Sequence, residues 1–575
     1  MEMNWRLFYF LNSKEQDANM ETIGADIVIQ ILKEEGVDAI FGYPGANTLP
    51  IHDRLINSQV RHYLMRHEQA AAHAADGYAR ATGKVGVCIA TSGPGATNLV
   101  TGIATAFMDS TPMVALTAQV STSLLGHDAF QETDIIGITL PITKHSYQVH
   151  DVNNLAATLR QAFELAKTGR PGPVLVDIPR DILSSKCDPA EKHAASPKIN
   201  NKAVEDHEQL EKIAKTLNQS ERPILIIGGG VKLSNAFRLI RELIEKAKIP
   251  FVTTMMGIGS VDSVNGYNLG LIGTHGNELA NRMVHQCDFI LAIGTRFSDR
   301  STALIEEFAP LAKIAQIDID PTSIGKSIKI NLPYVGDIRK ALTALLPLVD
   351  EKEKSEWLQR IQAEREAIDD KVTDTGCGQA GDFIRMVQDA MPVETTVTAD
   401  VGLNQIWTVR TWQARSPRSL ITSGGMGTMG FSLPAAIGAK VGTPERAVVA
   451  ITGDGGFYMN IQELATISYY NLPIKIVVIN NGHLGMIRQI QDLFYNARFN
   501  TIDLGSKVDF VTVARGFGIP GSRVAVDADP KAGIEAMVKA DGPYLLEAVV
   551  DPENYVYPII PPGCSNIEMM YDRLD

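Results

Sequence analysis

The stretch Val448-Val-Ala-Ile-Thr-Gly-Asp-Gly455 decides the fold, because an apolar run ends there directly in a glycine-rich turn. A second apolar run, Ile474–Ile479, follows and ends in Asn480-Asn481. Short apolar runs that alternate with longer helical stretches are typical of the strands of a parallel α/β sheet. The carboxyl ends of such strands form the ligand crevice of the sheet, so we expect Asp454 and Asn481 to lie close together.

A similar arrangement occurs earlier in the chain. Val87-Cys-Ile-Ala-Thr-Ser-Gly-Pro-Gly95 also joins an apolar run to a glycine-rich turn. In both copies an Ala-Thr pair follows, and a proline stands eight residues after the alanine (Ala104 and Pro112; Ala465 and Pro473). Chance similarity between two α/β segments is the alternative. If the similarity is real, two like domains flank an unlike one, and a site built between the copies is expected.

The length of 575 residues is enough for three or four domains. The pattern predicts an α/β protein with three doubly wound parallel-sheet domains, at residues 20–185, 200–348 and 378–560. Residues 1–19 precede the first amphipathic pattern and are expected to be a non-essential extension. The charged stretch Asp350–Asp374 predicts a solvent-exposed connecting helix.

Composition excludes several classes of protein. Hydrophobic residues make up 45% and charged residues 21%, which are ordinary globular values. The 53 basic and 66 acidic residues give a net charge of −13, which opposes binding to nucleic acid or to an anionic membrane. No apolar run approaches the roughly 20 residues of a membrane span. The five cysteines lie far apart without a C-x-x-C pair, which favours a reducing compartment, and the cytoplasm is expected.

The ends of the two apolar runs also indicate a metal site. A carboxylate at Asp454 and an amide oxygen at Asn481 are ligands that suit a hard cation such as Mg²⁺, which commonly bridges to a diphosphate. Two ordinary turns remain the alternative, since Gly-Asp-Gly is itself a common turn sequence.

Together these residues resemble the thiamine-diphosphate motif, which opens with G-D-G and closes with N-N. The resemblance implies that Asp454 and Asn481 are side-chain ligands of Mg²⁺ and that the backbone carbonyl of His483 completes the protein set. It also implies a carboxylic acid beside the aminopyrimidine ring of the cofactor, and Glu68, in Arg66-His-Glu-Gln-Ala-Ala-Ala72, stands at that place in the motif. The residue pattern alone is more typical of an acid that stabilises a helix N-terminus.

A longer series of motifs resembles, in order, the catalytic subunits of the acetohydroxyacid synthase (acetolactate synthase) family, over roughly residues 20–565. The motifs are Phe41-Gly-Tyr-Pro-Gly, Thr91-Ser-Gly-Pro-Gly-Ala-Thr-Asn98, Asp128-Ala-Phe-Gln-Glu, Ile142-Thr-Lys-His145, Thr168-Gly-Arg-Pro-Gly-Pro173, Arg296-Phe-Ser-Asp-Arg300 and Gly424-Gly-Met-Gly-Thr-Met-Gly-Phe431.

The resemblance assigns expected roles by position. Thiamine diphosphate is expected to contact Pro94, Asn98, Asn404, Met429, Gly453, Gly455, Gly456 and Met486, with Met429 as the apolar wedge that bends it. The substrate pocket is expected to contain Phe130, Gln131, Arg180 and Arg300, and a guanidinium suits the carboxylate of a 2-keto acid. A non-redox FAD is expected to contact Arg170, Gly228, Gly229, Gly230, Thr254, His275, Arg296, Asp318 and Asp337. The central unit lacks G-x-G-x-x-G, so its residue pattern alone indicates a nucleotide only weakly.

The implied activity is that of a carboligase of branched-chain amino-acid biosynthesis. It would decarboxylate pyruvate and condense the remaining unit with a second 2-keto acid, pyruvate or 2-ketobutyrate, to give 2-acetolactate from two pyruvates. A homodimer or homotetramer is implied, with a small regulatory subunit as a further partner. The alternatives are another thiamine-dependent 2-keto acid decarboxylase or oxidase, and a catalytically silent homologue.

Four positions depart from the family's pattern. Ile490 stands where a tryptophan favours 2-ketobutyrate, so that preference is not expected here. Leu403-Asn404 replace a Gln-His pair near the diphosphate, and leucine offers no hydrogen bond, so weaker diphosphate binding is expected. Ala46 stands where a second glycine is common, and Arg180 where a lysine is common.

Overall fold

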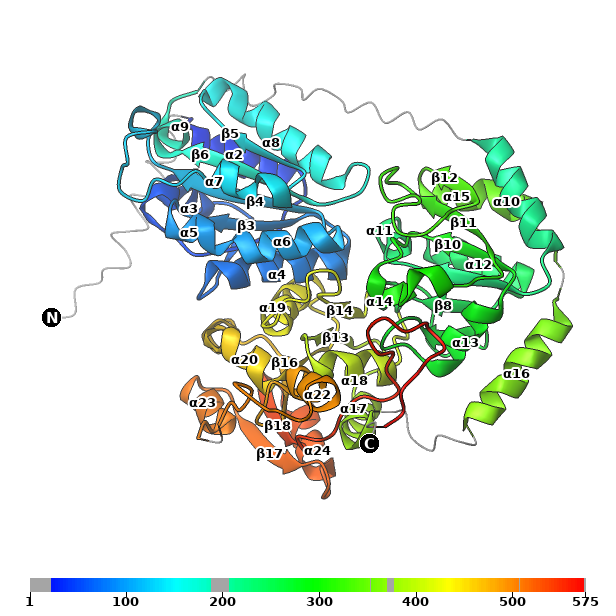
Figure 1. Ribbon diagram of the computed structural model, residues 1–575. Helices are drawn as coiled ribbons and strands as arrows, with labels where there is room; N and C mark the ends of the chain where they lie inside the picture. The colour runs from blue at the N-terminus through cyan, green and yellow to red at the C-terminus, as the bar shows by residue number, and fades with distance from the viewer. Residues whose placement is uncertain (1–21, 188–205, 352, 370–376, 506, 573–575) are drawn as a thin grey trace.

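The chain folds into three α/β units, each built on a six-stranded sheet in which every strand pair is parallel (Figure 1). The computed structural model describes residues 22–187, 206–351, 353–369, 377–505 and 507–572. The expected extension at residues 1–19 lies outside the described residues. The predicted fold class is confirmed.

The first unit contains strands β1 to β6 in the order β2-β1-β3-β4-β6-β5. Its strands are β1 (Ala39–Gly42), β2 (Arg61–Leu64), β3 (Gly86–Ala90), β4 (Met113–Gln119), β5 (His145–Gln148) and β6 (Pro173–Pro179). Its helices are α2 (Gly24–Glu34), α3 (Leu49–Leu55), α4 (Glu68–Thr82), α5 (Pro94–Asn98), α6 (Val100–Asp109), α7 (Ile135–Thr139), α8 (Val152–Lys167) and α9 (Arg180–Ser184).

The central unit has the strand order β12-β11-β10-β7-β8-β9. Its strands are β7 (Pro223–Ile227), β8 (Phe251–Thr253), β9 (Asn268–Leu271), β10 (Phe289–Ile293), β11 (Lys313–Asp318) and β12 (Leu332–Val335). Its helices are α10 (His207–Gln219), α11 (Gly230–Leu233), α12 (Phe237–Ala247), α13 (Glu278–Gln286), α14 (Asp299–Thr302) and α15 (Ile338–Leu345).

The third unit has the strand order β14-β13-β15-β16-β18-β17. Its strands are β13 (Thr396–Ala399), β14 (Leu420–Thr422), β15 (Val448–Gly453), β16 (Ile474–Asn480), β17 (Gly521–Ala525) and β18 (Tyr544–Val549). Its helices are α17 (Gly378–Ala390), α18 (Leu403–Thr411), α19 (Ser432–Gly442), α20 (Asp454–Met459), α21 (Leu464–Tyr469), α22 (Gly485–Phe494), α23 (Phe510–Gly516) and α24 (Lys531–Lys539).

The first and third sheets share one topology, because β13 to β18 take the same relative places as β1 to β6. The two glycine-rich turns noticed in the sequence follow β3 and β15, which are equivalent strands. Pro112 and Pro473 come directly before β4 and β16, which are also equivalent. The internal similarity is therefore a duplicated fold rather than chance.

The two copies pack through equivalent helices, α4 and α19, which lie between the first and third sheets (Figure 1). An added Cβ on Gly77 of α4 would lie 2.2 Å from the carbonyl oxygen of Ala435, and one on Gly438 of α19 would lie 1.8 Å from that of Ala74. Gly77 thus contacts Ala435, which comes three residues before Gly438. Gly438 contacts Ala74, which comes three residues before Gly77. The contact is reciprocal, as at a two-fold interface, although both helices belong to one chain.

Replacing Gly438 by Ala should therefore lower the melting temperature by several degrees. The new methyl group cannot be accommodated beside Ala74 unless the two helices separate, and overpacking of this kind costs about 1–3 kcal/mol. Gly516→Ala is the matched control, because Gly516 ends α23 with no atom within 4 Å of an added Cβ. Differential scanning calorimetry measures the melting temperatures of the two variants. Equal values would contradict the close packing proposed for Gly438.

The charged stretch after the central unit forms helix α16 (Ser355–Asp369). The expectation of a solvated connecting helix is wrong for one face, since Trp357 and Ile361 are buried against the central unit. The indole of Trp357 donates to the carbonyl of Pro223 at 3.2 Å. Leu358 and Ile368 also pack against this cluster, so the apolar residues of α16 bury one face of a helix rich in charge.

Candidate functional site

The residues expected to act on the cofactor ring lie at the carboxyl ends of the first sheet's strands. Glu68 is the first residue of α4, directly after β2, and is half-buried. Its Oε2 accepts a hydrogen bond from Nδ2 of Asn98 at 3.0 Å, and its Oε1 would lie 3.3 Å from a Cβ on Gly95. Glu68 therefore faces the glycine-rich turn that begins with Pro94, not only its own helix.

The loop after β4 presents Phe130 and Gln131. Gln131 has a φ of 62° and lies against Gly93, where an added Cβ would come within 3.0 Å of it. The carboxylate of Glu132 accepts from the main chain of Gly126 and, at 2.9 Å, of Ala129, which fixes the loop. Phe130 is 88% exposed, so a single chain encloses it only slightly.

The two arginines expected in the substrate pocket are also exposed. Arg180 begins α9, directly after β6, at the same edge of the first sheet as Glu68. The side chain of Arg300 on α14 is 73% exposed, with Nε 3.6 Å from the carboxylate of Asp299.

The third sheet carries the expected metal ligands. Asp454 follows β15, and its Oδ1 and Oδ2 accept from the backbone N–H groups of Gly455 and Gly482, each at 2.8 Å. Gly482 directly follows Asn481, so Asp454 is tied to the turn that ends β16. Nδ1 of His483 lies 2.9 Å from the carbonyl oxygen of Asn481. This contact engages Nδ1 of the imidazole, which suits metal binding by the backbone carbonyl of His483.

The carboxyl group of Asp454 fits a cation. Burial raises its pKa to about 6, against the lowering effect of its backbone hydrogen bonds. In the described ranges, no three His, Cys, Asp or Glu side chains gather closely enough to hold a metal ion by themselves. A site with one carboxylate, one amide and one carbonyl oxygen leaves positions for a ligand's own oxygens, as Mg²⁺ with a diphosphate requires.

The glycine turn and the expected wedge lie against each other. An added Cβ on Gly455 would lie 3.3 Å from the Cε of Met429, and one on Gly456 would lie 2.8 Å from the carboxyl carbon of Asp400. Asn404 is buried behind Gly453, where an added Cβ would meet its Oδ1 at 3.2 Å. Met486 is half-buried on α22, which follows the Asn481 turn.

The loop of Met429 is braced on both sides. Thr428 is 2.7 Å from the hydroxyl of Thr105, and Gly430 donates to Oδ1 of Asp400 at 2.9 Å. Burial raises the pKa of Asp400 to about 6. These bonds hold the side chain of Thr428 and the main chain of Gly430, the two residues that flank Met429.

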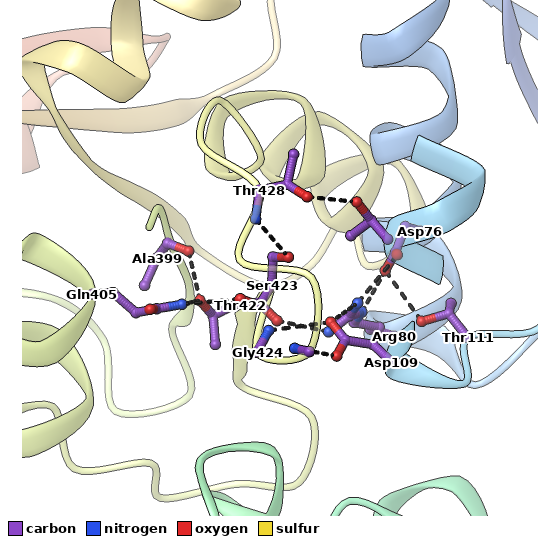
Figure 2. A network of polar contacts seen from close by, with 12 residues as sticks. Asp76, Arg80, Asp109, Thr111, Ala399, Gln405, Thr422, Ser423, Gly424 and Thr428 are labelled. Carbon is purple, nitrogen blue, oxygen red and sulfur yellow. Dashed lines mark hydrogen bonds and ion pairs between the residues drawn. The ribbon is translucent and has the colours of Figure 1, made fainter. Parts of the chain in front are cut away.

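Three charged residues of the first unit, the buried Asp76 and Asp109 and the largely buried Arg80, hold the start of the same loop (Figure 2). Arg80 lies between the carboxylates of Asp76 and Asp109, with Nη2 2.9 Å from Asp109, and donates to the carbonyl of Thr422 at 2.7 Å. Asp109 in turn accepts from the N–H groups of Gly424 and Gly425, at 3.2 and 2.7 Å. The sequence did not predict a role for Asp109, whereas Asp76 and Arg80 lie in α4, the helix that begins at Glu68.

A second buried carboxylate was also missed. Glu463 is fully buried, accepts from the backbone N–H of Arg66 at 2.9 Å and from the hydroxyl of Thr466 at 2.8 Å. Burial raises the pKa of Glu463 to about 7, against those two hydrogen bonds and the charge of Arg66, which lower it. No local pattern could have identified this residue, because its partner is 397 residues away.

The positions expected to bind FAD lie mostly at the carboxyl ends of the central strands. Gly228–Gly230 follow β7, Thr254 follows β8, His275 comes after β9, Arg296 after β10, Asp318 ends β11, and Asp337 follows β12. Burial lowers the pKa of His275 to about 4, which keeps the imidazole neutral. Asp337 caps α15, its carboxylate accepting from the N–H of Lys340 at 3.0 Å.

Two arginines make this edge suitable for an anion. Arg170 donates to Ser110 at 2.7 Å and pairs with Asp320 at 3.3 Å. Burial and the neighbouring Arg170 lower the pKa of Arg296, against the attraction of nearby carboxylates such as Asp318, which raises it. A partly buried guanidinium beside a second one fits the phosphate of a dinucleotide. Gly229 also borders a cavity of about 180 Å³ where the three units meet.

Comparison with known proteins identifies the family of the chain. Three domain models of thiamine pyrophosphate enzymes match: the N-terminal TPP binding domain at residues 22–138, the central domain at 210–345, and the C-terminal TPP binding domain at 400–548. The chain is 46% identical over 564 residues to a probable acetolactate synthase large subunit of Methanocaldococcus jannaschii, covering 94% of both chains.

Two proteins of Escherichia coli K12 are also similar. The large subunit of acetolactate synthase isozyme 2 is 42% identical over 549 residues, which cover 95% of this chain and 99% of that one. The large subunit of isozyme 1 is 39% identical over 555 residues, which cover 95% and 97%. The chain therefore belongs to the thiamine pyrophosphate enzymes and, within them, to the family of acetolactate synthase large subunits.

Proposed function

We propose that this protein is an acetolactate synthase, which converts two molecules of pyruvate into one of 2-acetolactate and one of CO₂. The observation that carries the proposal is the buried Asp454 carboxylate held against the Asn481 turn, in a chain whose relatives bear that name over nearly their whole length. Thiamine diphosphate, when bound, supplies the carbanion chemistry that releases CO₂ and forms the new carbon–carbon bond.

The residues of this chain would bind, orient and move protons. Asp454, Asn481 and the carbonyl of His483 would hold Mg²⁺, and Gly453, Gly455 and Gly456 leave room for the diphosphate. Met429 would press on the cofactor from a braced loop. Glu68 would exchange a proton with the aminopyrimidine ring, as general acid–base catalysis requires. FAD would be bound by the central unit and take no part in redox chemistry.

Purified protein supplied with thiamine diphosphate, Mg²⁺, FAD and pyruvate tests this proposal. Acetolactate and CO₂ in equal amounts are expected. Acetaldehyde as the sole organic product would point to a decarboxylase, and reduction of the flavin by pyruvate would point to an oxidase. Bound cofactor without turnover would identify a silent homologue.

We further propose that two chains complete each site. Apolar side chains near both half-sites are exposed, among them Phe130 at 88% and Met426 at 49%, and exposed apolar groups of this kind mark interfaces and ligand sites. The name "large subunit" of the relatives supports a small regulatory partner. None of the described helices combines the length and apolar character that crossing a bilayer needs. A role in branched-chain amino-acid biosynthesis and a cytoplasmic location stay predictions.

The acceptor preference should depend on Ile490, which is 39% exposed on α22. Ile490→Trp adds apolar surface, and a CH₂ group buried against it gains about 0.8 kcal/mol. The use of 2-ketobutyrate relative to pyruvate should therefore rise about fourfold, measured as the product ratio when both acids compete. Val393→Trp, which changes a side chain 71% exposed on the amino side of β13, should leave the ratio unchanged. A strong preference for 2-ketobutyrate in the unaltered protein would contradict the role of Ile490.

A further inference from the structure

The third unit covers the open edge of the first sheet close to Glu68. Strand β2 is the outermost strand of that sheet, so one side of its main chain has no neighbouring strand. Glu463, Thr466 and Tyr470 occupy positions i, i+3 and i+7 along the helical segment Ile461–Tyr469 and its C-cap, and so lie on one face of it. We call these three residues the edge clamp.

Each member of the edge clamp bonds to the main chain of an alternate residue of β2 or its continuation. The hydroxyl of Tyr470 accepts from the N–H of Leu64 at 2.9 Å and donates to the carbonyl of His62 at 3.3 Å. The single hydroxyl proton of Thr466 is shared between the carbonyl of Leu64, at 3.1 Å, and the carboxyl group of Glu463, at 2.8 Å. Glu463 in turn accepts from the N–H of Arg66. Side chains thus replace the missing strand as hydrogen-bond partners.

Glu463 is the member whose main-chain partner, Arg66, comes nearest to Glu68 along the chain. Its Oε1 binds the N–H of Arg66, and its Oε2 is oriented by the hydroxyl of Thr466. The guanidinium of Arg66 donates instead to the carbonyl of Leu64 at 3.3 Å. The buried carboxyl group therefore acts on the backbone and not on the guanidinium beside it.

Only His67 separates the fixed N–H of Arg66 from Glu68. Nδ1 of His67 accepts from the N–H of Gln69 at 3.1 Å and so caps α4. A shift of the Arg66 main chain would move the start of α4, and with it the carboxylate of Glu68 relative to Asn98.

We propose that Glu463 is a positioning residue, which holds the main chain at Arg66 so that Glu68 stands at the correct distance from the cofactor. This inference rests on the proposed function, in which Glu68 is the activating acid. Glu463 follows Asp454 by nine residues in the same segment of the third unit. The segment from Asp454 to Glu463 then holds the expected metal ligand of the third unit and also positions Glu68 of the first unit.

Hydrogen–deuterium exchange of the ligand-free protein tests the contact without any activity. In Glu463→Ala the amide of Arg66 should exchange about 10-fold to 100-fold faster, as expected when a buried N–H loses its acceptor. In the holoenzyme, kcat should fall about 10-fold, because small misplacements of a catalytic group are costly, while the KM for pyruvate changes less than about twofold. Glu463→Gln should restore both the slow exchange of the Arg66 amide and kcat, because the amide oxygen of glutamine can accept the hydrogen bond from the N–H of Arg66.

The other members of the edge clamp supply the controls. Tyr470→Phe removes the bonds to His62 and Leu64 but leaves Arg66 bound, so it should loosen the strand edge with kcat within about threefold of the unaltered enzyme. If Glu463→Ala does not fold, Thr466→Val removes the hydroxyl that orients Glu463 and should raise Arg66 exchange about fivefold.

Three results would overturn the proposal: unchanged Arg66 exchange in Glu463→Ala, no rescue by Gln, or an equal loss of kcat in Tyr470→Phe. Failure of the unaltered protein to form acetolactate would refute the proposed function instead, and leaves the exchange result to be judged separately.

Discussion

Glu68→Gln should reduce the rate of acetolactate formation by about 100-fold to 10,000-fold while thiamine diphosphate still binds. Glutamine keeps the oxygen that accepts from Asn98, so the side chain can stay where Glu68 stands beside the Gly95 turn. It cannot take up or release a proton in the neutral range, so proton exchange with the aminopyrimidine ring should fail. Exchange of the C2 proton of bound thiamine diphosphate for deuterium, followed by nuclear magnetic resonance, measures that step directly.

The competing interpretation makes Glu68 only an acid in the first turn of a helix. On that view the substitution would cost about 0.3–1 kcal/mol of stability and would leave catalysis intact. Glu356 is the matched control, since it is an exposed acid in the first turn of α16, far from any expected site residue. Glu356→Gln should alter neither the rate of acetolactate formation nor the rate of C2 proton exchange. A Glu68→Gln enzyme that is as active as Glu356→Gln would refute the assigned role.

The local features of this chain could be predicted from its sequence. An apolar run followed by Gly-Asp-Gly fixes a strand, a turn and the start of a helix within ten residues, and β15 with α20 follows that pattern. The repeated spacing from alanine to proline predicted two like domains, and the two sheets have one strand order. These features depend on neighbours in the chain, which a sequence shows directly.

The contacts that join the units could not be predicted in this way. Asp109 binds the N–H groups of Gly424 and Gly425, more than 300 residues away, and any buried acceptor could have served. Glu463 looks in sequence like an ordinary charged residue of a helix, yet it is fully buried because the main chain of Arg66 needs an acceptor. Likewise, the charged composition of α16 hid the apolar residues that bury one of its faces.

Exposure at Phe130 and Arg300 has a different explanation. Both occupy motif positions expected in the substrate pocket. Phe130 lies in the loop after β4 and Arg300 in the helix α14 that follows β10, and both side chains are exposed in one chain. A pocket that needs a second chain would leave its residues exposed in the first. The exposure of these two side chains is consistent with the proposed dimer, in which a second chain would cover them.

Asp454→Ala should abolish the stabilisation that Mg²⁺ and thiamine diphosphate give to the protein. The carboxylate is buried, so folding without a cation costs free energy, which the raised pKa of Asp454 reflects. A ligand at 100 times its dissociation constant stabilises the native state by about 2.7 kcal/mol. Removal of a metal ligand should weaken binding at least about 100-fold, which removes nearly all of that gain. Melting temperatures with and without the two ligands measure the effect.

Two controls make this result specific to anchoring. Asp503 is an exposed carboxylate on the strand-like segment that pairs with His483, and Asp503→Ala should keep the full rise in melting temperature. Glu68→Gln should keep the rise in melting temperature as well, because Glu68 is expected to exchange a proton with the cofactor and not to bind the metal. A full rise in Asp454→Ala would show that the metal is held elsewhere. We expect Glu68→Gln to bind the cofactor without turnover and Asp454→Ala to show neither binding nor turnover. Together these results would distinguish the residues that hold the cofactor from the residue that activates it.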